Sequence, residues 1–184
     1  MHIDNKLAIV NSSMPDMLKQ YACGKDRTEI ERPSWDDELL SKALLTAKRS
    51  PDMQTQCGCV ITDARHRELG SGYNGFPRDI DDSLLPNLRP SKYPWMIHSE
   101  VNAILNCSIK EENMIAYITS QPCLACTLFM WQAGVREIVY IPAGHAKMTL
   151  NDEYKENMEI IKYLTRGRLK WREHVPNIEH VEQL

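Results

Sequence analysis

Long apolar segments are absent from this chain of 184 residues. No stretch reaches the roughly 18 to 20 consecutive apolar residues that a membrane-spanning helix needs, and the start of the chain has charged side chains where a secretory signal would have an apolar core. A basic surplus of the kind that neutralises many phosphates at once is absent too, since the formal net charge is -3. We therefore expect a cytoplasmic protein that binds neither a membrane nor long nucleic acid.

The composition shows no bias toward disorder or toward a disulfide framework. Hydrophobic residues make up 42% of the chain and charged residues 26%, close to the averages for soluble globular proteins. The six cysteines are expected to stay reduced, because no secretory signal is evident and a chain of this length can bury its own core. Residues 1–33 are polar without sustained periodicity, so we expect an N-terminal extension of unknown role there and one domain at 34–184.

Apolar periodicity predicts helices and strands that alternate along the chain. Helices are expected at 34–49, 98–107, 123–133 and 151–164, and strands at 57–62, 66–72, 114–119 and 137–141. Residues 168–175 fit either an edge strand or a further helical piece, and residues 72–96, with four prolines, form an irregular segment. The alternation indicates an α/β layered domain.

Two short motifs lie at the starts of consecutive predicted helices, His98-Ser99-Glu100 and Pro122-Cys123-Leu124-Ala125-Cys126. By chance, H-x-E occurs in roughly one chain in three of this length and P-C-x-x-C in roughly one in a hundred, so the second motif is the stronger indication. One imidazole and two thiolates suit tetrahedral zinc with a fourth position open to water. We predict one zinc ion per chain, held by His98, Cys123 and Cys126.

The acid of the first motif predicts what the zinc does. Residues two apart on a regular helix point about 200° away from each other, so His98 and Glu100 face one metal only where the chain enters the helix. Glu100 then accepts a proton from a zinc-bound water and returns it to a leaving group, which indicates hydrolysis. The alternative is a structural zinc site, but this needs a fourth protein ligand, and the sequence has no second C-x-x-C.

H-x-E followed by P-C-x-x-C is the signature of zinc nucleobase deaminases. Over roughly residues 34–165 the chain resembles deoxycytidylate deaminases, and the resemblance is carried by four segments in the family's order, 55–61, 72–77, 98–104 and 132–135. The Tyr-Asn-Gly-Phe-Pro run in the second segment favours this family over relatives that act on nucleosides, tRNA or single-stranded DNA. This chain departs from the family at three positions. It has Ser99 where the family usually has alanine, and Cys57 and Cys59 where the family usually has valine and alanine.

The resemblance implies a three-layer cytidine-deaminase-like fold, with a central mixed sheet of about five strands flanked by helices. It also implies hydrolysis of dCMP to dUMP and ammonia, which supplies dUMP for dTMP synthesis. Two alternatives stay open: a zinc deaminase of cytidine, dCTP, tRNA adenosine or single-stranded DNA cytosine, and a non-catalytic protein that binds zinc or nucleotides.

Substrate contacts are implied by the same resemblance. Asn74 is expected to hydrogen-bond the sugar hydroxyl, although asparagine is common in such turns for backbone reasons alone. Arg49 and Asn102 are expected to meet the nucleotide phosphate. The alternatives are that Arg49 only caps the preceding helix and that Asn102 only faces solvent.

Regulation is the last implication of the resemblance, because similar enzymes are hexamers activated by dCTP and inhibited by dTTP. A homohexamer is therefore expected, with an allosteric loop that contains Gly72, Tyr73, Gly75, Phe76 and Arg78. Acidic residues that follow Arg78 would hold Mg²⁺ together with the triphosphate. The alternative is a solvated acidic turn.

Overall fold

The computed structural model describes residues 32–142 and 152–177. Backbone contacts divide the chain into two units, Met1–Arg32 and Pro33–Leu184, and the fold described below is that of the second. Its strands form one sheet in the order β2-β1-β3-β4-β5. Their bounds are β1 Gly58–Thr62, β2 Glu68–Tyr73, β3 Met114–Ile118, β4 Val135–Tyr140 and β5 Lys170–Glu173.

The sheet is mixed, as predicted. Strand β1 pairs antiparallel with both β2 and β3, whereas β3 pairs parallel with β4, and β4 parallel with β5. The C-terminal piece is therefore an edge strand, in which Trp171 lies opposite Ile138 and packs edge-on against Tyr140. Of the two interpretations of residues 168–175, the strand is correct.

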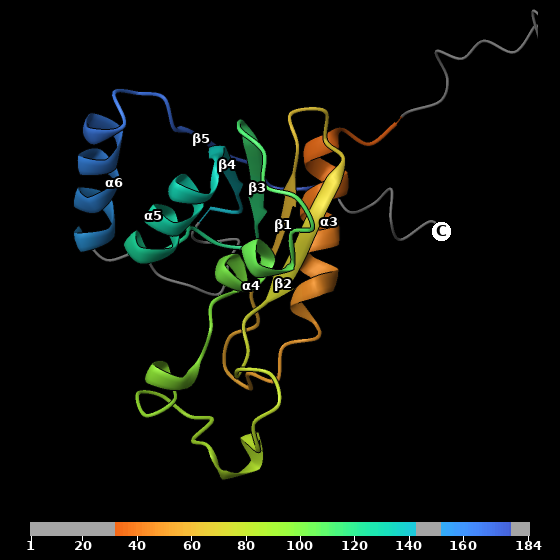
Figure 1. Cartoon of the computed structure of the whole chain (residues 1–184), viewed down its shortest axis with the longest axis vertical. Helices are drawn as coiled ribbons and strands as arrows, with labels where there is room; N and C mark the ends of the chain where they lie inside the picture. Colours follow the sequence, from red (N-terminus) through yellow and green to blue (C-terminus); the bar gives the residue numbers. More distant parts are fainter. Residues whose placement is uncertain (1–31, 143–151, 178–184) are drawn as a thin grey trace, which may run out of the picture. The chain divides into compact units, whose positions relative to one another are not determined.

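Helices cover both faces of the sheet (Figure 1). Helix α3 (Trp35–Ala47) lies on one face, and α4 (Ser99–Asn106), α5 (Leu124–Ala133) and α6 (Asp152–Leu164) lie on the other. Alternate residues of each central strand point to opposite faces. In β3, Ile115 and Tyr117 join the core under α3, while Met114, Ala116 and Ile118 join the core under the other helices. Because both faces are buried, the central strands are continuous apolar runs, and the predicted three-layer α/β fold is confirmed.

Most strand ends differ from the prediction by one or two residues, and β4 and β2 extend beyond a predicted end. Strand β4 begins at Val135 and not at 137, because Arg136 can lie in a strand while its guanidinium stacks over Trp131 and pairs with Glu112. Strand β2 continues to Tyr73, which pairs with Gly58, so the irregular segment begins later than residue 72. Gly72 is required there by the packing of strand against helix, since a Cβ atom on it would lie 2.3 Å from the backbone nitrogen of Ala103 in α4.

The irregular segment leaves β2 and returns to α4. Its two ends meet in a bridge, in which Gly75 and Ile97 exchange backbone hydrogen bonds of 3.0 and 2.8 Å. Between them lie two short 3₁₀ helices, η2 (Asp82–Leu84) and η3 (Tyr93–Trp95). A buried ion pair of 2.5 Å joins Lys92 in this segment to Asp52, which follows α3. Within the described residues, no helix has the length and apolar character needed to cross a bilayer.

Candidate active site

Two helix N-termini bring the three predicted zinc ligands together. His98 is the extended N-cap residue of α4, Cys123 is the N-cap residue of α5, and Cys126 lies in the first turn of α5. The Nδ1 atom of His98 is 3.6 Å from Sγ of Cys123 and 3.3 Å from Sγ of Cys126. Among the described residues, these three form the one cluster of candidate metal ligands, with all ligand atoms within 4.8 Å of one another.

The geometry of this cluster fits zinc. Bonds of about 2.3 Å to sulfur and about 2.0 Å to nitrogen, at tetrahedral angles, separate a sulfur and a nitrogen ligand by about 3.5 Å. The two distances from His98, 3.6 and 3.3 Å, lie on either side of that value. Three protein ligands leave one tetrahedral position for water, which is the pattern of catalytic and not of structural zinc.

The two thiols differ in their affinity for protons. A hydrogen bond from Cys126 and another from His98 lower the pKa of Cys123 to about 4. The hydrogen bond to Cys123 and burial raise the pKa of Cys126. A cation between the sulfurs would deprotonate both, because a metal ion stabilises the thiolate form of every thiol that it binds. A zinc ion bound by the cluster would therefore hold both sulfurs as thiolates.

Glu100 lies beside the ligands in the first turn of α4, with only 5% of its surface exposed. Burial raises the pKa of its carboxyl group, which makes it a better proton acceptor than an exposed glutamate. The hydroxyl of Ser99 donates a hydrogen bond of 2.9 Å to Oε2 of Glu100. Alanine, which the family usually has at this position, could not make this bond. The sequence shows that serine replaces the usual alanine at position 99, but only the structure shows that its hydroxyl hydrogen-bonds Glu100.

A cavity of about 670 Å³ opens over the cluster. This volume lies within the usual range for small-molecule sites. Its wall includes the predicted ligands His98 and Cys123 together with Glu100. The other lining residues come from the segment after α3, the residue that follows β2, the irregular segment, the start of α4 and the loop before α5: Asp52, Thr55, Cys57, Asn74, Arg89, Lys92, Tyr93, Met96, Ser99, Ser120 and Gln121.

Asn74 reaches the cavity, and its side-chain amide is held by the protein. Its Oδ1 accepts a hydrogen bond of 2.7 Å from the backbone N–H of Cys57, and its Nδ2 donates to the carbonyl of Thr55 and to Oδ2 of Asp52. An amide oxygen has two lone pairs, so one remains for a ligand hydroxyl. The sequence did not indicate this framework.

The two predicted phosphate contacts do not line the cavity. The guanidinium of Arg49 lies 5.9 Å from the centre of the Tyr73 ring, and Nδ2 of Asn102 donates a hydrogen bond of 2.8 Å to the carbonyl of Tyr73. Both therefore support the end of β2. Of the residues expected in an allosteric loop, Gly72 and Tyr73 belong to β2, and Arg78 hydrogen-bonds Asn106 in α4.

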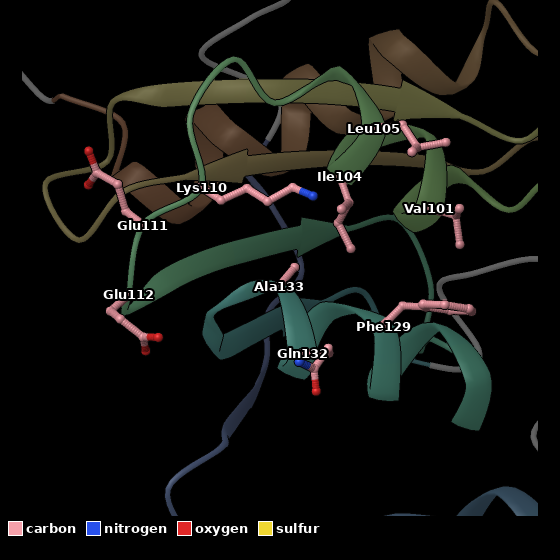
Figure 2. A pocket seen from close by; sticks show the side chains of 9 residues that line it. All are labelled: Val101, Ile104, Leu105, Lys110, Glu111, Glu112, Phe129, Gln132 and Ala133. Atoms are coloured by element: carbon pink, nitrogen blue, oxygen red, sulfur yellow. The ribbon is translucent and has the colours of Figure 1, made fainter.

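A second hollow, of about 550 Å³, lies between α4 and α5 (Figure 2). Phe129 and Gln132 on α5 and Leu105 on α4 face this hollow, and Lys110 lies along it. None of its lining residues is a cysteine or a histidine. The hollow therefore lacks the ligands that catalysis of this type requires, and the cavity over His98 is the candidate active site.

Comparison with known proteins agrees with this site. Residues 33–142 match the family described as the cytidine and deoxycytidylate deaminase zinc-binding region. The chain belongs to this deaminase family. The match contains all three ligands and Glu100, and it confirms both the predicted resemblance and a zinc-dependent hydrolytic deaminase.

Individual relatives place the chain within the deaminase family. Deoxycytidylate deaminase of Mus musculus is 31% identical over 149 residues, which cover 77% of this chain and 77% of that protein. The Homo sapiens enzyme is 30% identical over 131 residues, covering 67% of this chain and 72% of that protein. The structure of dCMP deaminase from cyanophage S-TIM5, in complex with dCMP and dUMP, aligns with a TM-score of 0.60 at 18% identity, over 79% of this chain and 100% of that one. That alignment shows a common fold.

Proposed function

We propose that this deaminase converts dCMP and water to dUMP and ammonia. The observation that carries the proposal is the buried carboxyl group of Glu100 beside a His-Cys-Cys zinc site, inside a cavity that can hold a nucleotide. The deoxycytidylate deaminases of Mus musculus and Homo sapiens support dCMP as the substrate. The product dUMP would then supply dTMP synthesis.

In this proposal His98, Cys123 and Cys126 hold the zinc ion. Bound zinc supplies a Lewis acid that lowers the pKa of water. Glu100 accepts a proton from the attacking water and returns it to the departing amino group, so that one carboxyl group serves as base and then as acid. Ser99 keeps Oε2 of Glu100 in place through its hydrogen bond. Asn74, fixed by Cys57 and Thr55, presents its free lone pair to the sugar hydroxyl.

A substrate panel tests this proposal. Purified protein is incubated with cytidine, dCMP, CMP, dCTP and a cytosine-containing oligonucleotide, while ultraviolet absorbance and ammonia are followed. We expect turnover of dCMP with one ammonia released for each dUMP formed. Activity on the oligonucleotide alone would contradict the proposal, and a protein that binds dCMP without releasing ammonia would indicate a non-catalytic binding protein.

We further propose that the enzyme is a cytoplasmic homohexamer regulated by dCTP and dTTP with Mg²⁺. The residues concerned are Gly72 and Tyr73 at the end of β2 and Gly75, Phe76 and Arg78 in the segment that follows it. The support for this proposal is the resemblance to regulated deoxycytidylate deaminases. Sedimentation velocity measures the oligomer. Hyperbolic dCMP turnover that neither triphosphate changes at saturating Mg²⁺ would refute the regulation and leave the deaminase activity standing.

The phosphate contacts of Arg49 and Asn102 also remain proposals. Each holds the end of β2 through Tyr73, so the loss of either side chain has to be separated from a loss of local structure. An Arg49→Gln variant that keeps the wild-type KM for dCMP would remove Arg49 from phosphate binding.

A further inference from the structure

The cavity wall has two cations with different surroundings, Arg89 and Lys92. The ammonium of Lys92 lies 2.5 Å from Oδ1 of Asp52, and both side chains are almost fully buried. Burial alone would raise the pKa of Asp52, but Lys92 and the backbone N–H groups of Gln54 and Thr55 lower it, so the carboxylate remains charged. The charge of Lys92 is therefore neutralised inside the protein.

Arg89 has no such carboxylate. Its guanidinium donates a hydrogen bond of 2.5 Å to the hydroxyl of Thr55, and its backbone N–H donates one of 2.9 Å to Oε1 of Gln54. Both partners are neutral, and within residues 32–142 and 152–177 Arg89 forms no ion pair. A guanidinium has five N–H donors, so most of them remain free for a ligand.

The other charged groups of the cavity wall are each balanced by a neighbour or belong to the zinc site, so Arg89 is the group that can bind an anion. Glu100 is adjacent to the zinc ligands, and His98 and Cys123 are the charged groups that most affect its pKa. Asp52 is neutralised by Lys92. Zinc with two thiolates and a neutral imidazole has no net charge. The positive charge of Arg89 is thus the one on the described wall that nothing offsets.

The matching ligand group is a phosphate monoester. A planar guanidinium donates two parallel hydrogen bonds to phosphate oxygens, which gives both affinity and orientation. Resting on the proposed deamination of dCMP, we propose that Arg89 binds the 5′-phosphate and makes the enzyme select nucleotides over nucleosides. The hydrogen bond to Thr55 holds the guanidinium at the wall, and the bond from the backbone N–H of Arg89 to Gln54 holds its main chain. The Lys92–Asp52 pair fixes the segment that carries Arg89.

The test compares Arg89→Gln, Arg89→Lys and Arg65→Gln in the zinc-loaded full-length protein. Arg65 is an exposed arginine in the turn between β1 and β2, outside the cavity, so its loss changes the net charge equally. For Arg89→Gln we expect the KM for dCMP to rise roughly 10- to 100-fold, as for other lost charge-assisted hydrogen bonds, with kcat within about twofold of wild type. Arg89→Lys keeps the positive charge but loses the planar guanidinium, so its KM for dCMP should lie between those of wild type and Arg89→Gln. Arg65→Gln should have the wild-type KM.

Two further measurements separate phosphate binding from a structural role. Turnover of deoxycytidine at high enzyme concentration should be the same in Arg89→Gln and wild type, and inorganic phosphate should compete with dCMP in wild type but not in the variant. A KM for dCMP within twofold of wild type would overturn the assignment, and so would an equal loss for dCMP and deoxycytidine. Both results presuppose an active wild-type enzyme, whereas a wild-type protein inactive on dCMP would refute the proposed function itself.

Discussion

Replacing Gly72 by alanine tests how the sheet positions the catalytic helix. A Cβ atom at this position would lie 2.3 Å from the backbone nitrogen of Ala103 and 2.7 Å from the carbonyl oxygen of Ser99, both in α4. Ordinary contact begins at 3.4 Å, so α4 must move away from β2 by about 1 Å. The neighbouring atoms belong to the backbone, which cannot rotate aside as a side chain can. The first turn of α4 carries Glu100, so the active site moves with the helix.

The expected cost follows from overpacking. Inserting a methyl group into a close-packed contact costs about 1 to 3 kcal/mol, which in a protein of this size lowers Tm by about 2 to 12 °C. A displacement of about 1 Å at the catalytic groups lowers the rate roughly 100-fold. Thermal unfolding and kcat/KM for dCMP measure the two effects in Gly72→Ala. Gly75→Ala is the matched control for stability, since its Cβ would meet nothing closer than 3.5 Å. An unchanged Tm together with kcat/KM within twofold of wild type would refute the argument.

Three further predictions concern the site and its support. Cys126→Ser should lose most of the bound zinc, because a hydroxyl replaces a thiolate poorly; elemental analysis that finds about one zinc per chain in this variant would show that the ligand set is wrong. Glu100→Ala should keep its zinc but lose several orders of magnitude in kcat, since the carboxyl group moves protons and does not bind metal; near-normal turnover would exclude it from proton transfer. Lys92→Met should cost about 3 to 5 kcal/mol in the free energy of unfolding, because Asp52 stays buried without its cation. The pKa of Asp52 is below its ordinary value in the wild type, so its stabilisation is complete above the unfolded value of 3.8 and is lost as the pH falls through the folded value. Without Lys92 the folded pKa of Asp52 rises, so less stability should be lost on acidification below 3.8 in unfolding experiments on Lys92→Met. A loss equal to that of the wild type would contradict this prediction.

The sequence was sufficient to predict the cluster of candidate metal ligands, because its signal is local. His98 and Glu100 are two residues apart at a helix entry, and Cys123 and Cys126 are three apart at another, so spacing alone predicts which side chains share a direction. The observed N-cap positions of His98 and Cys123 are those that this reasoning requires. The elements of the fold were predictable for the same reason, since the apolar runs in β1 and β3 and the stripe on α3 need only neighbouring residues to be recognised.

The ends of the strands were less predictable. The start of β4 was predicted two residues too late, because charged Arg136 interrupts the apolar pattern of the strand. Its side chain is accommodated by Trp131 and Glu112, which lie outside the strand. Gly72 was expected to begin a loop, since glycine is common in loops, but only its contact with α4 shows that close packing requires it. In both cases a partner distant in the chain outweighs the local pattern.

The substrate side of the cavity was decided by tertiary structure alone. Lys92 and Asp52 are 40 residues apart, and Arg89 and Thr55 are 34 apart. The segment that carries Arg89 has no hydrophobic periodicity, so nothing in the sequence predicts which way its side chains point. Its path is fixed by the bridge at Gly75 and by the buried ion pair, and these contacts exist only once the sheet has formed. The sequence by itself thus determined which side chains form the candidate metal cluster and which carboxyl group adjoins it, because their spacing is local, whereas the folded chain decided which cation faces the cavity, because that depends on long-range contacts.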